Sequence, residues 1–151
     1  MQNQRGSEGF TLLEILIVVT IIGVLMAVVA PRFLGRAEEA KAKLASVQID
    51  KIAGTIDLYR IDNGTYPTTD QGLDALVAPP TSGPQPRRYQ PGGYAKDKDL
   101  LDPWGGPLTY QAPGQVNTSS FDLCSLGPDG QPGGDGSNAD ICNYNSGRRE
   151  S

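Results

Sequence analysis

The chain has 151 residues, which is room for about one domain. Its formal net charge of −4 argues against nucleic acid as a partner, because a phosphate-binding face needs clustered Lys and Arg. The sequence contains no histidine, which removes the commonest general base, the commonest transition-metal ligand and every histidine-based catalytic triad, so the composition argues against an enzyme.

The first predicted element is an apolar helix over residues 10–30, which read FTLLEILIVVTIIGVLMAVVA. At about 1.5 Å per residue this helix is about 31 Å long, close to the hydrocarbon thickness of a bilayer. A buried core helix is one alternative, but the rest of the chain offers too little apolar surface to surround it. A secretory signal peptide is another, and it lacks an A-x-A-like cleavage site after the apolar run. The sequence therefore predicts a membrane-spanning helix.

Glu14 is the one charged residue of this segment. A carboxylate at membrane depth costs several kcal/mol unless it is paired or protonated, so such acids are candidates for function. Between Arg5 and Arg32 the sequence offers no Lys or Arg as a partner. We therefore expect a cation from outside the segment to neutralise Glu14.

The N-terminal residues resemble the prepilin leader of type IV pilins and pseudopilins. A short polar leader over residues 1–9 ends in Gly9, the aromatic Phe10 follows, and Glu14 comes four residues later. The resemblance implies cleavage between Gly9 and Phe10 by a prepilin peptidase, followed by N-methylation of Phe10. The new amine then lies one helical turn from Glu14 and can pair with this acid in the same copy or in a neighbouring copy. We expect processing to permit filament assembly by supplying this positive charge.

Residues 31–63 are predicted to continue the helix in amphipathic form, after a possible kink at Pro31. The apolar residues recur mostly three or four positions apart and form one expected stripe: Ala37, Ala40, Leu44, Val47, Ile52, Ile56 and Tyr59. Five cations lie largely outside this stripe: Arg32, Arg36, Lys41, Lys43 and Lys51. They form either a solvated face or contacts with a membrane surface or another subunit. The pair Asn63-Gly64 predicts the end of the helix, because glycine is the preferred left-handed cap.

Residues 64–151 are predicted to form a small, turn-rich periplasmic part. A short helix is expected at residues 70–77, and strands are expected at 108–111 and 121–124, which would form an antiparallel sheet laid across the long helix. Residues 102–105 read as a tight turn. A core of this size usually needs a staple, a metal or a neighbour for stability.

This part of the sequence resembles the major pseudopilin of bacterial type II secretion systems. Five motifs match in the same order: NGTYPT at 63–68, GL at 72–73, GGY at 92–94, DPWG at 102–105 and SLGPDG at 125–130. The last two distinguish this family from ordinary type IV pilins. The resemblance implies a pilin-like α+β fold, in which a long N-terminal helix, half transmembrane and half amphipathic, packs on a small antiparallel sheet with a calcium-binding loop.

The segment 125–141 is the best candidate for a metal site, because it combines acids with glycines that let backbone carbonyls point inward. Hard oxygen ligands of this kind suit Ca²⁺, although from spacing alone the acids could simply be solvated. The resemblance implies one structural calcium. Its expected ligands are the backbone carbonyls of Leu126 and Gln131 and the side chains of Asp129 and Asp140. Two further residues, Asp135 and Ser137, stay open as ligands because this loop is longer than in the family.

Cys124 and Cys142 bracket this loop, at positions where the family usually lacks cysteine. In an oxidising periplasm we expect a disulfide, which would contribute about 3 kcal/mol for a loop of this length. Two buried free thiols are the alternative.

The resemblance implies a structural subunit that polymerises, after leader cleavage, into a periplasmic pseudopilus and so drives exoproteins through the outer membrane. The implied partners are further copies of the chain, minor pseudopilins, an inner-membrane assembly platform and the prepilin peptidase. The implied location is the bacterial inner membrane, crossed once with the N-terminus cytoplasmic, and then the pseudopilus. A type IV pilin of a surface pilus is the first alternative. A membrane-anchored binding module that stays monomeric is the second.

Overall fold

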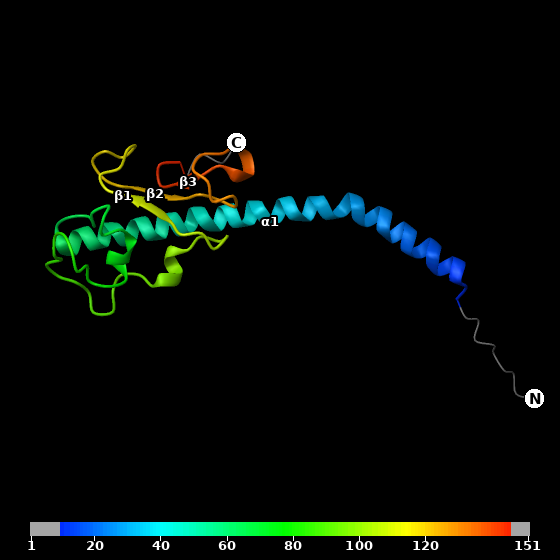
Figure 1. The fold of residues 1–151 in the computed structure, drawn as a ribbon, viewed down its shortest axis with the longest axis horizontal. Helices are drawn as coiled ribbons and strands as arrows, with labels where there is room; N and C mark the ends of the chain where they lie inside the picture. The colour runs from blue at the N-terminus through cyan, green and yellow to red at the C-terminus, as the bar shows by residue number, and fades with distance from the viewer. Residues whose placement is uncertain (1–9, 146–151) are drawn as a thin grey trace, which may run out of the picture. The chain divides into compact units, whose positions relative to one another are not determined.

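A computed structural model of the chain describes residues 10–145, with the side chains of Val28 and residues 30–34 left out. The expected leader, residues 1–9, and its cleavage after Gly9 lie outside the described residues. The element order is one long helix followed by three short strands, with single turns of 3-10 helix between them (Figure 1).

Helix α1 runs from Leu12 to Asn63 over 52 residues. Thr11 caps its start, since its hydroxyl oxygen accepts the backbone N–H of Glu14 at 3.2 Å. The helix ends at the predicted residue: Gly64 takes a φ of 87°, and its N–H donates to the Arg60 carbonyl at 2.7 Å. The helix is assigned without a break across Pro31.

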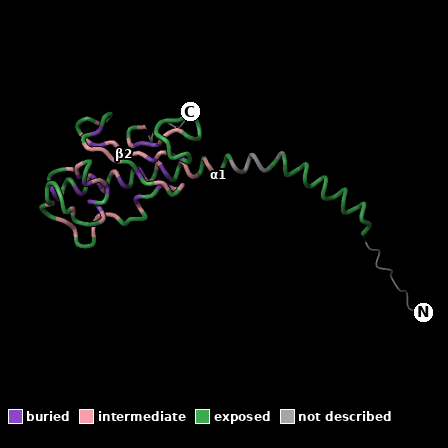
Figure 2. The backbone as a smooth tube through the Cα atoms, viewed as in Figure 1, coloured by how far each residue is buried: buried purple, intermediate pink, exposed green. Residues whose placement is uncertain are grey.

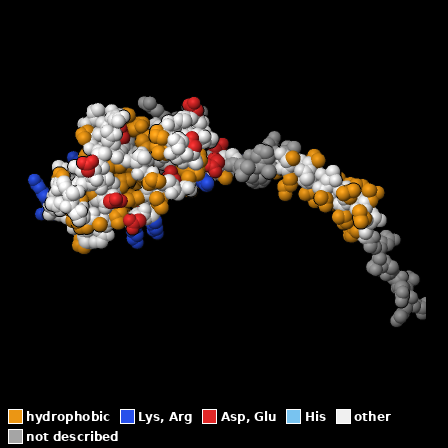
Figure 3. Space-filling view, in the orientation of Figure 1, with side chains coloured by type: hydrophobic (Ala, Val, Ile, Leu, Met, Phe, Trp, Pro, Cys, Tyr) orange, Lys and Arg blue, Asp and Glu red, His pale blue; other side chains and the backbone are white. Residues whose placement is uncertain are grey.

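The chain divides into two compact units, residues 1–37 and residues 38–151. In the first unit, the large apolar side chains that the structure describes are exposed, between 86% at Leu12 and 42% at Val29. Figure 3 shows these hydrophobic side chains at the surface of the described helix. Among the residues described, no helix satisfies both the length and the hydropathy required of a membrane span.

The second unit contains the hydrophobic core (Figure 2). One face of α1 supplies Ala45, Ile49, Ile52, Ile56 and Tyr59, which are at most 2% exposed. The rest of the chain packs against this face with the following buried side chains: Leu73, Ala75, Leu76, Leu100, Leu108, Phe121, Leu123 and Ile141.

The expected apolar stripe on α1 was partly wrong. Ile52, Ile56 and Tyr59 are buried as predicted, but Leu44 and Val47 are 61% and 67% exposed, and Ala37 and Ala40 are exposed too. Successive helical residues point about 100° apart, so Leu44 lies well away from the buried Ala45. The small sheet and loops cover one side of α1, and the apolar residues occupy more than that side.

The sheet has three antiparallel strands in the order β1-β2-β3: Thr109–Gln111, Asp122–Ser125 and Ile141–Cys142. Tyr110 lies opposite Leu123, and Cys124 lies opposite Cys142. The first two strands confirm the predicted ones to within a residue, whereas β3 was not predicted. The helix expected at residues 70–77 is a single 3-10 turn, Leu73–Leu76, because Gly72 before it has a φ of 59°, outside the helical region.

Candidate functional site

Phe10 and Glu14 lie at the start of α1. Phe10 precedes the helix and is 78% exposed, and the exposed Glu14 lies in the first turn. In the described part of the chain, ion pairs join Lys41 to Glu38 and Lys51 to Asp99, and neither involves Glu14. The structure therefore leaves Glu14 accessible to a cation from another molecule or from the chain terminus.

The candidate metal loop connects β2 to β3 and is organised by two of its acids. The Oδ1 atom of Asp129 accepts the N–H of Gln131 at 3.1 Å. The Oδ2 atom of Asp140 accepts the N–H of Gly133 at 2.8 Å, and the Asp140 N–H donates back to the Gly133 carbonyl at 3.1 Å. At Gly134, with a φ of 78°, a Cβ atom would lie 2.5 Å from the Asn138 carbonyl oxygen. Asp140 therefore closes the loop, and glycine allows its tightest turn.

The donor chemistry of this loop fits calcium, which binds oxygen atoms only. Asp129 is exposed and Asp140 is half-buried. Asp135 and Ser137 are both exposed; Asp135 directly precedes the 3-10 turn Gly136–Asn138, and Ser137 lies within it. Within the described residues, no group of three or more acidic, histidine or cysteine side chains gathers as a metal cluster. Leu126 and Gln131, whose backbone carbonyls are the other expected ligands, lie in the same loop.

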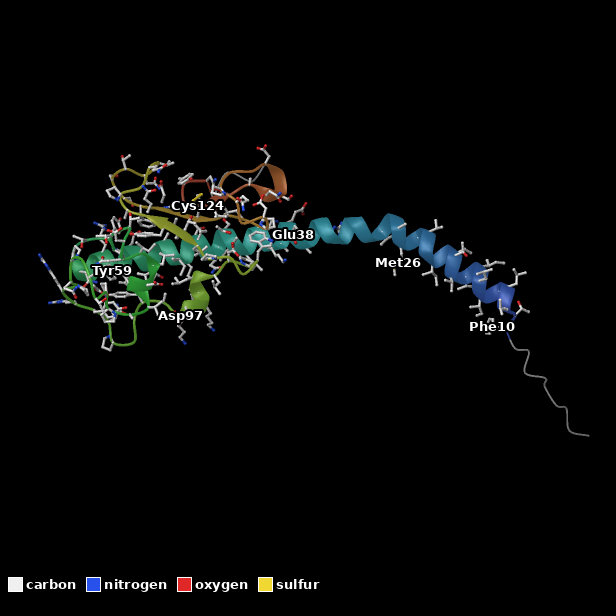
Figure 4. The ribbon with its side chains drawn as sticks, in the orientation of Figure 1. Phe10, Met26, Glu38, Tyr59, Asp97 and Cys124 are labelled. Atoms are coloured by element: carbon white, nitrogen blue, oxygen red, sulfur yellow. A yellow bond between two sulfur atoms is a disulfide. The ribbon has the colours of Figure 1, made fainter. Side chains whose placement is uncertain are left out.

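A disulfide joins Cys124 on β2 to Cys142 on β3, with the sulfur atoms 2.06 Å apart and the two cysteines 18 positions apart in sequence (Figure 4). The same two residues lie opposite each other in the sheet, and Ser125 lies opposite Ile141. Both ends of the loop are thus held together by strand pairing and by a covalent bond.

A buried carboxylate connects the DPWG turn to the beginning of the loop. Asp102 is 6% exposed. Its Oδ1 atom accepts the N–H groups of Trp104 at 3.0 Å and Gly106 at 2.8 Å, and its Oδ2 atom accepts the hydroxyl of Ser125 at 2.6 Å. Ser125 Oγ in turn accepts the N–H of Gly127 at 3.3 Å. The sequence suggested the turn and the loop separately, and the structure joins them in one hydrogen-bond network.

Trp104 links this hydrogen-bond network to α1. Its indole N–H donates to the Glu38 carboxylate at 2.7 Å, and the Lys41 ammonium contacts the same carboxylate at 3.5 Å. The hydrogen bond from Trp104 lowers the pKa of Glu38 below its usual value, since it stabilises the charged form. Sequence reasoning found the turn but missed the partners Glu38 and Ser125, which lie 66 and 23 residues from their bonded residues.

Two further motifs of the sequence meet at the C-terminal end of α1. The amide of Asn63 donates to the Tyr94 hydroxyl at 3.0 Å, and the Asn63 side-chain oxygen accepts the N–H of Arg88 at 2.9 Å. A Cβ atom on Gly93, whose φ is 79°, would lie 2.6 Å from the Val77 carbonyl oxygen. The Asn-Gly and Gly-Gly-Tyr motifs thus fix the connection between residues 77 and 94 against the end of the helix.

The sequence matches the family described as type II secretion system protein G over residues 32–144, and a prokaryotic N-terminal methylation motif over residues 2–30. It is 47% identical to the type II secretion system core protein G of Pseudomonas aeruginosa, covering 95% of this chain and 99% of that relative. The core protein G of Vibrio cholerae is also 47% identical, over 96% of this chain and 97% of that relative. The fold resembles the crystal structure of the major pseudopilin from the type 2 secretion system of enterohaemorrhagic Escherichia coli, with a TM-score of 0.65 and 38% identity. The alignment covers 78% of this chain and 94% of that structure.

Proposed function

The chain belongs to the protein G family of type II secretion systems, and from this membership we infer that it is a structural subunit of the pseudopilus. The match over residues 32–144 carries this conclusion, because it includes the turn at 102–105 and the loop at 125–130. It favours the pseudopilus over a surface pilus. The family consists of structural subunits, and an enzymatic role is not proposed.

Residues 1–9 are the prepilin leader, and cleavage between Gly9 and Phe10 is followed by N-methylation of Phe10. The support is the match to an N-terminal methylation motif over residues 2–30. The amine released on Phe10 neutralises Glu14 of its own or a neighbouring copy. Processing thereby removes the cost of an unpaired carboxylate in an apolar helix bundle and permits assembly.

Residues 10–30 anchor the chain in the bacterial inner membrane with the N-terminus cytoplasmic, and the same segment later forms the filament core. The support is their nearly uniform apolar composition. Residues 31–63 continue the helix and residues 64–151 form the periplasmic part. The partners are further copies, minor pseudopilins, the inner-membrane platform and the prepilin peptidase, and growth of the pseudopilus moves exoproteins through the outer membrane.

The loop between β2 and β3 binds one structural calcium ion. The side chains of Asp129 and Asp140 and the carbonyls of Leu126 and Gln131 hold it, with Asp135 and Ser137 as further candidates. When bound, the ion neutralises acidic charge and stabilises the loop conformation. The support is the all-oxygen donor set and the glycine-dependent turns of the loop.

The filament proposal is tested with Glu14→Ala and Glu14→Gln in the full chain, expressed with its secretion system. We expect both variants to insert in the membrane yet yield no filaments by electron microscopy and no secretion. Glu39→Ala is the matched control, because it removes an exposed carboxylate from the same helix. Normal filaments from Glu14→Ala would contradict the role given to this residue.

The calcium proposal is tested separately, by thermal unfolding of the full chain in mild detergent with Ca²⁺ and with EGTA. We expect Ca²⁺ to raise the Tm of the wild type, since a ligand at 100-fold excess over its Kd stabilises by about 2.7 kcal/mol. Asp129→Ala and Asp140→Ala should lose this shift, and Asp70→Ala, an exposed acid outside the loop, should keep it. Equal Tm values with and without Ca²⁺ in the wild type would refute calcium binding and leave the filament proposal intact.

A further inference from the structure

Leu126, one of the two expected carbonyl ligands of the metal loop, lies between two residues that are held in place. Ser125 is fully buried at the end of β2, where it pairs with Ile141. Gly127 is buried and donates its N–H to Ser125 Oγ at 3.3 Å. A backbone carbonyl turns only with the chain on either side of it, because the peptide unit is planar. These contacts therefore set the direction of the Leu126 carbonyl.

Gly127 also joins the two ends of the loop. Its φ is 70°, and a Cβ atom there would lie 3.6 Å from the carbonyl oxygen of Asn138. The backbone after Leu126 thus packs directly against the segment that leads into Asp140. Leu126 directly follows β2, and Asp140 directly precedes β3. Two of the expected ligands therefore come from adjacent segments whose contact depends on Gly127.

Asp102 makes a hydrogen bond that its own turn does not need. Its Oδ1 atom accepts both N–H groups of the turn, from Trp104 at 3.0 Å and from Gly106 at 2.8 Å. Its Oδ2 atom reaches out of the turn and accepts the Ser125 hydroxyl at 2.6 Å. An asparagine oxygen could make the first two bonds. The second carboxylate oxygen of Asp102 therefore serves the loop and not the turn.

We infer that Asp102 and Ser125 are positioning residues for the Leu126 carbonyl in the calcium site. Asp102 orients the Ser125 hydroxyl, whose oxygen in turn holds the N–H of Gly127. The inference rests on the proposed calcium site, and it adds two residues that supply no ligand themselves. The DPWG turn, with Asp102 located 23 positions before Ser125, thereby becomes part of the metal site. Replacing a residue that orients a metal ligand typically weakens metal binding about 10–100-fold.

The test is isothermal titration calorimetry of the full chain with Ca²⁺, in mild detergent and well below the Tm of each variant. Ser125→Ala removes the hydroxyl that connects Asp102 to Gly127. Asp102→Asn keeps one oxygen for the turn and replaces the other by an amide group, which cannot accept the Ser125 hydroxyl. We expect the Kd for Ca²⁺ to rise about tenfold or more in each variant. An unchanged Kd in either variant would overturn the inference and leave the calcium site standing.

Two controls separate positioning from a general loss of stability. Ser120→Ala removes a half-buried hydroxyl that bonds Tyr66 at 3.4 Å, outside the loop. Ile56→Val lowers the Tm in EGTA by removing a methylene group from the core. Both should bind Ca²⁺ as the wild type does, and a Kd raised as much in Ile56→Val as in Ser125→Ala would overturn the inference. A wild type that binds no Ca²⁺ would instead refute the calcium proposal, and the inference with it.

Hydrogen exchange in EGTA tests the positioning without the ion. The Gly127 N–H should exchange faster in Ser125→Ala than in the wild type, because its acceptor is lost. The Gly72 N–H, which donates to the Thr68 carbonyl at 3.0 Å outside the loop, should exchange at the same rate in both. NMR of the full chain in mild detergent measures both rates. Equal exchange of the Gly127 N–H in the two proteins would overturn the inference even if Ser125→Ala bound Ca²⁺ more weakly.

Discussion

Asp102→Ala is expected to destabilise the second unit by about 3–5 kcal/mol. The substitution removes the acceptor for three donors: the N–H groups of Trp104 and Gly106 and the hydroxyl of Ser125. Leaving a buried donor unsatisfied costs about 1–3 kcal/mol. Ser125 is fully buried, whereas Trp104 and Gly106 are half-buried and can recover some hydration. The expected loss in the free energy of unfolding is therefore smaller than the cost of three fully buried, unsatisfied donors. It is still large beside the free energy of unfolding of about 5–15 kcal/mol that is typical of a domain.

The measurement is urea unfolding of the full chain in mild detergent, followed by the fluorescence of Trp104, the single tryptophan of the chain. Asp70→Ala removes an exposed carboxylate and should change the free energy of unfolding by about 0.5 kcal/mol or less. Ser125→Ala should cost about 1–2 kcal/mol, and the double variant should cost less than the sum, because both changes remove the same hydrogen bond. A loss below about 1 kcal/mol in Asp102→Ala, or strict additivity in the double variant, would refute the reasoning.

Three further predictions concern the second unit. Burial raises the pKa of the Tyr110 hydroxyl, because it disfavours the ionised form. The contribution of the neutral hydroxyl to the free energy of unfolding is therefore complete below the unfolded pKa of about 10, and it is lost as the pH rises above that value. Tyr110→Phe should therefore reduce the slope of unfolding free energy against pH above about 10, and an unchanged slope would contradict this. Replacing Cys124 and Cys142 by serine should cost about 3 kcal/mol in urea unfolding, since the disulfide joins residues 18 positions apart in sequence. The reduced wild type should be as stable as this double variant, and a double variant as stable as the oxidised wild type would argue against the bond. Trp104→Phe should raise the pKa of Glu38 towards its usual value, because the indole donor is lost. A carbon-13 NMR titration measures this pKa, and an unchanged value would show that the hydrogen bond from Trp104 does not lower it.

Local signals in the sequence predicted the elements that depend on local geometry. Gly64 predicted the end of α1 because glycine takes the left-handed conformation without strain. The apolar and β-branched residues near 109–111 and 122–125 predicted β1 and β2. Strand β3 has two residues, Ile141 and Cys142, which is too short for any periodic pattern. It exists because it pairs with β2, and pairing across the loop is not a local property.

Burial on α1 shows where periodicity stops being informative. Apolar residues occur around much of this helix, and the sequence does not say which of them the sheet will cover. The expected stripe therefore combined Ile52 and Ile56, which the core covers, with Leu44 and Val47, which it leaves exposed.

The candidate sites also differ in whether they depend on local motifs or on partners that are distant in sequence. The family resemblance named Asp129 and Asp140 for the loop, and their role with calcium stays a prediction. The buried Asp102 read only as the first residue of a turn, because its partner Ser125 and the Trp104 partner Glu38 are distant in sequence.

The paired ends of the loop between β2 and β3 have a consequence for variation among related proteins. Strand pairing and the disulfide fix the separation of Ser125 and Ile141, whatever lies between them. Doubling the length of a flexible loop between fixed ends costs only about 0.6 kcal/mol in closure entropy. Insertions between Gln131 and Asp140, outside the family motif at 125–130, can therefore accumulate while the core against α1 stays unchanged. This segment is where we expect the surface of the periplasmic part to diverge fastest between secretion systems.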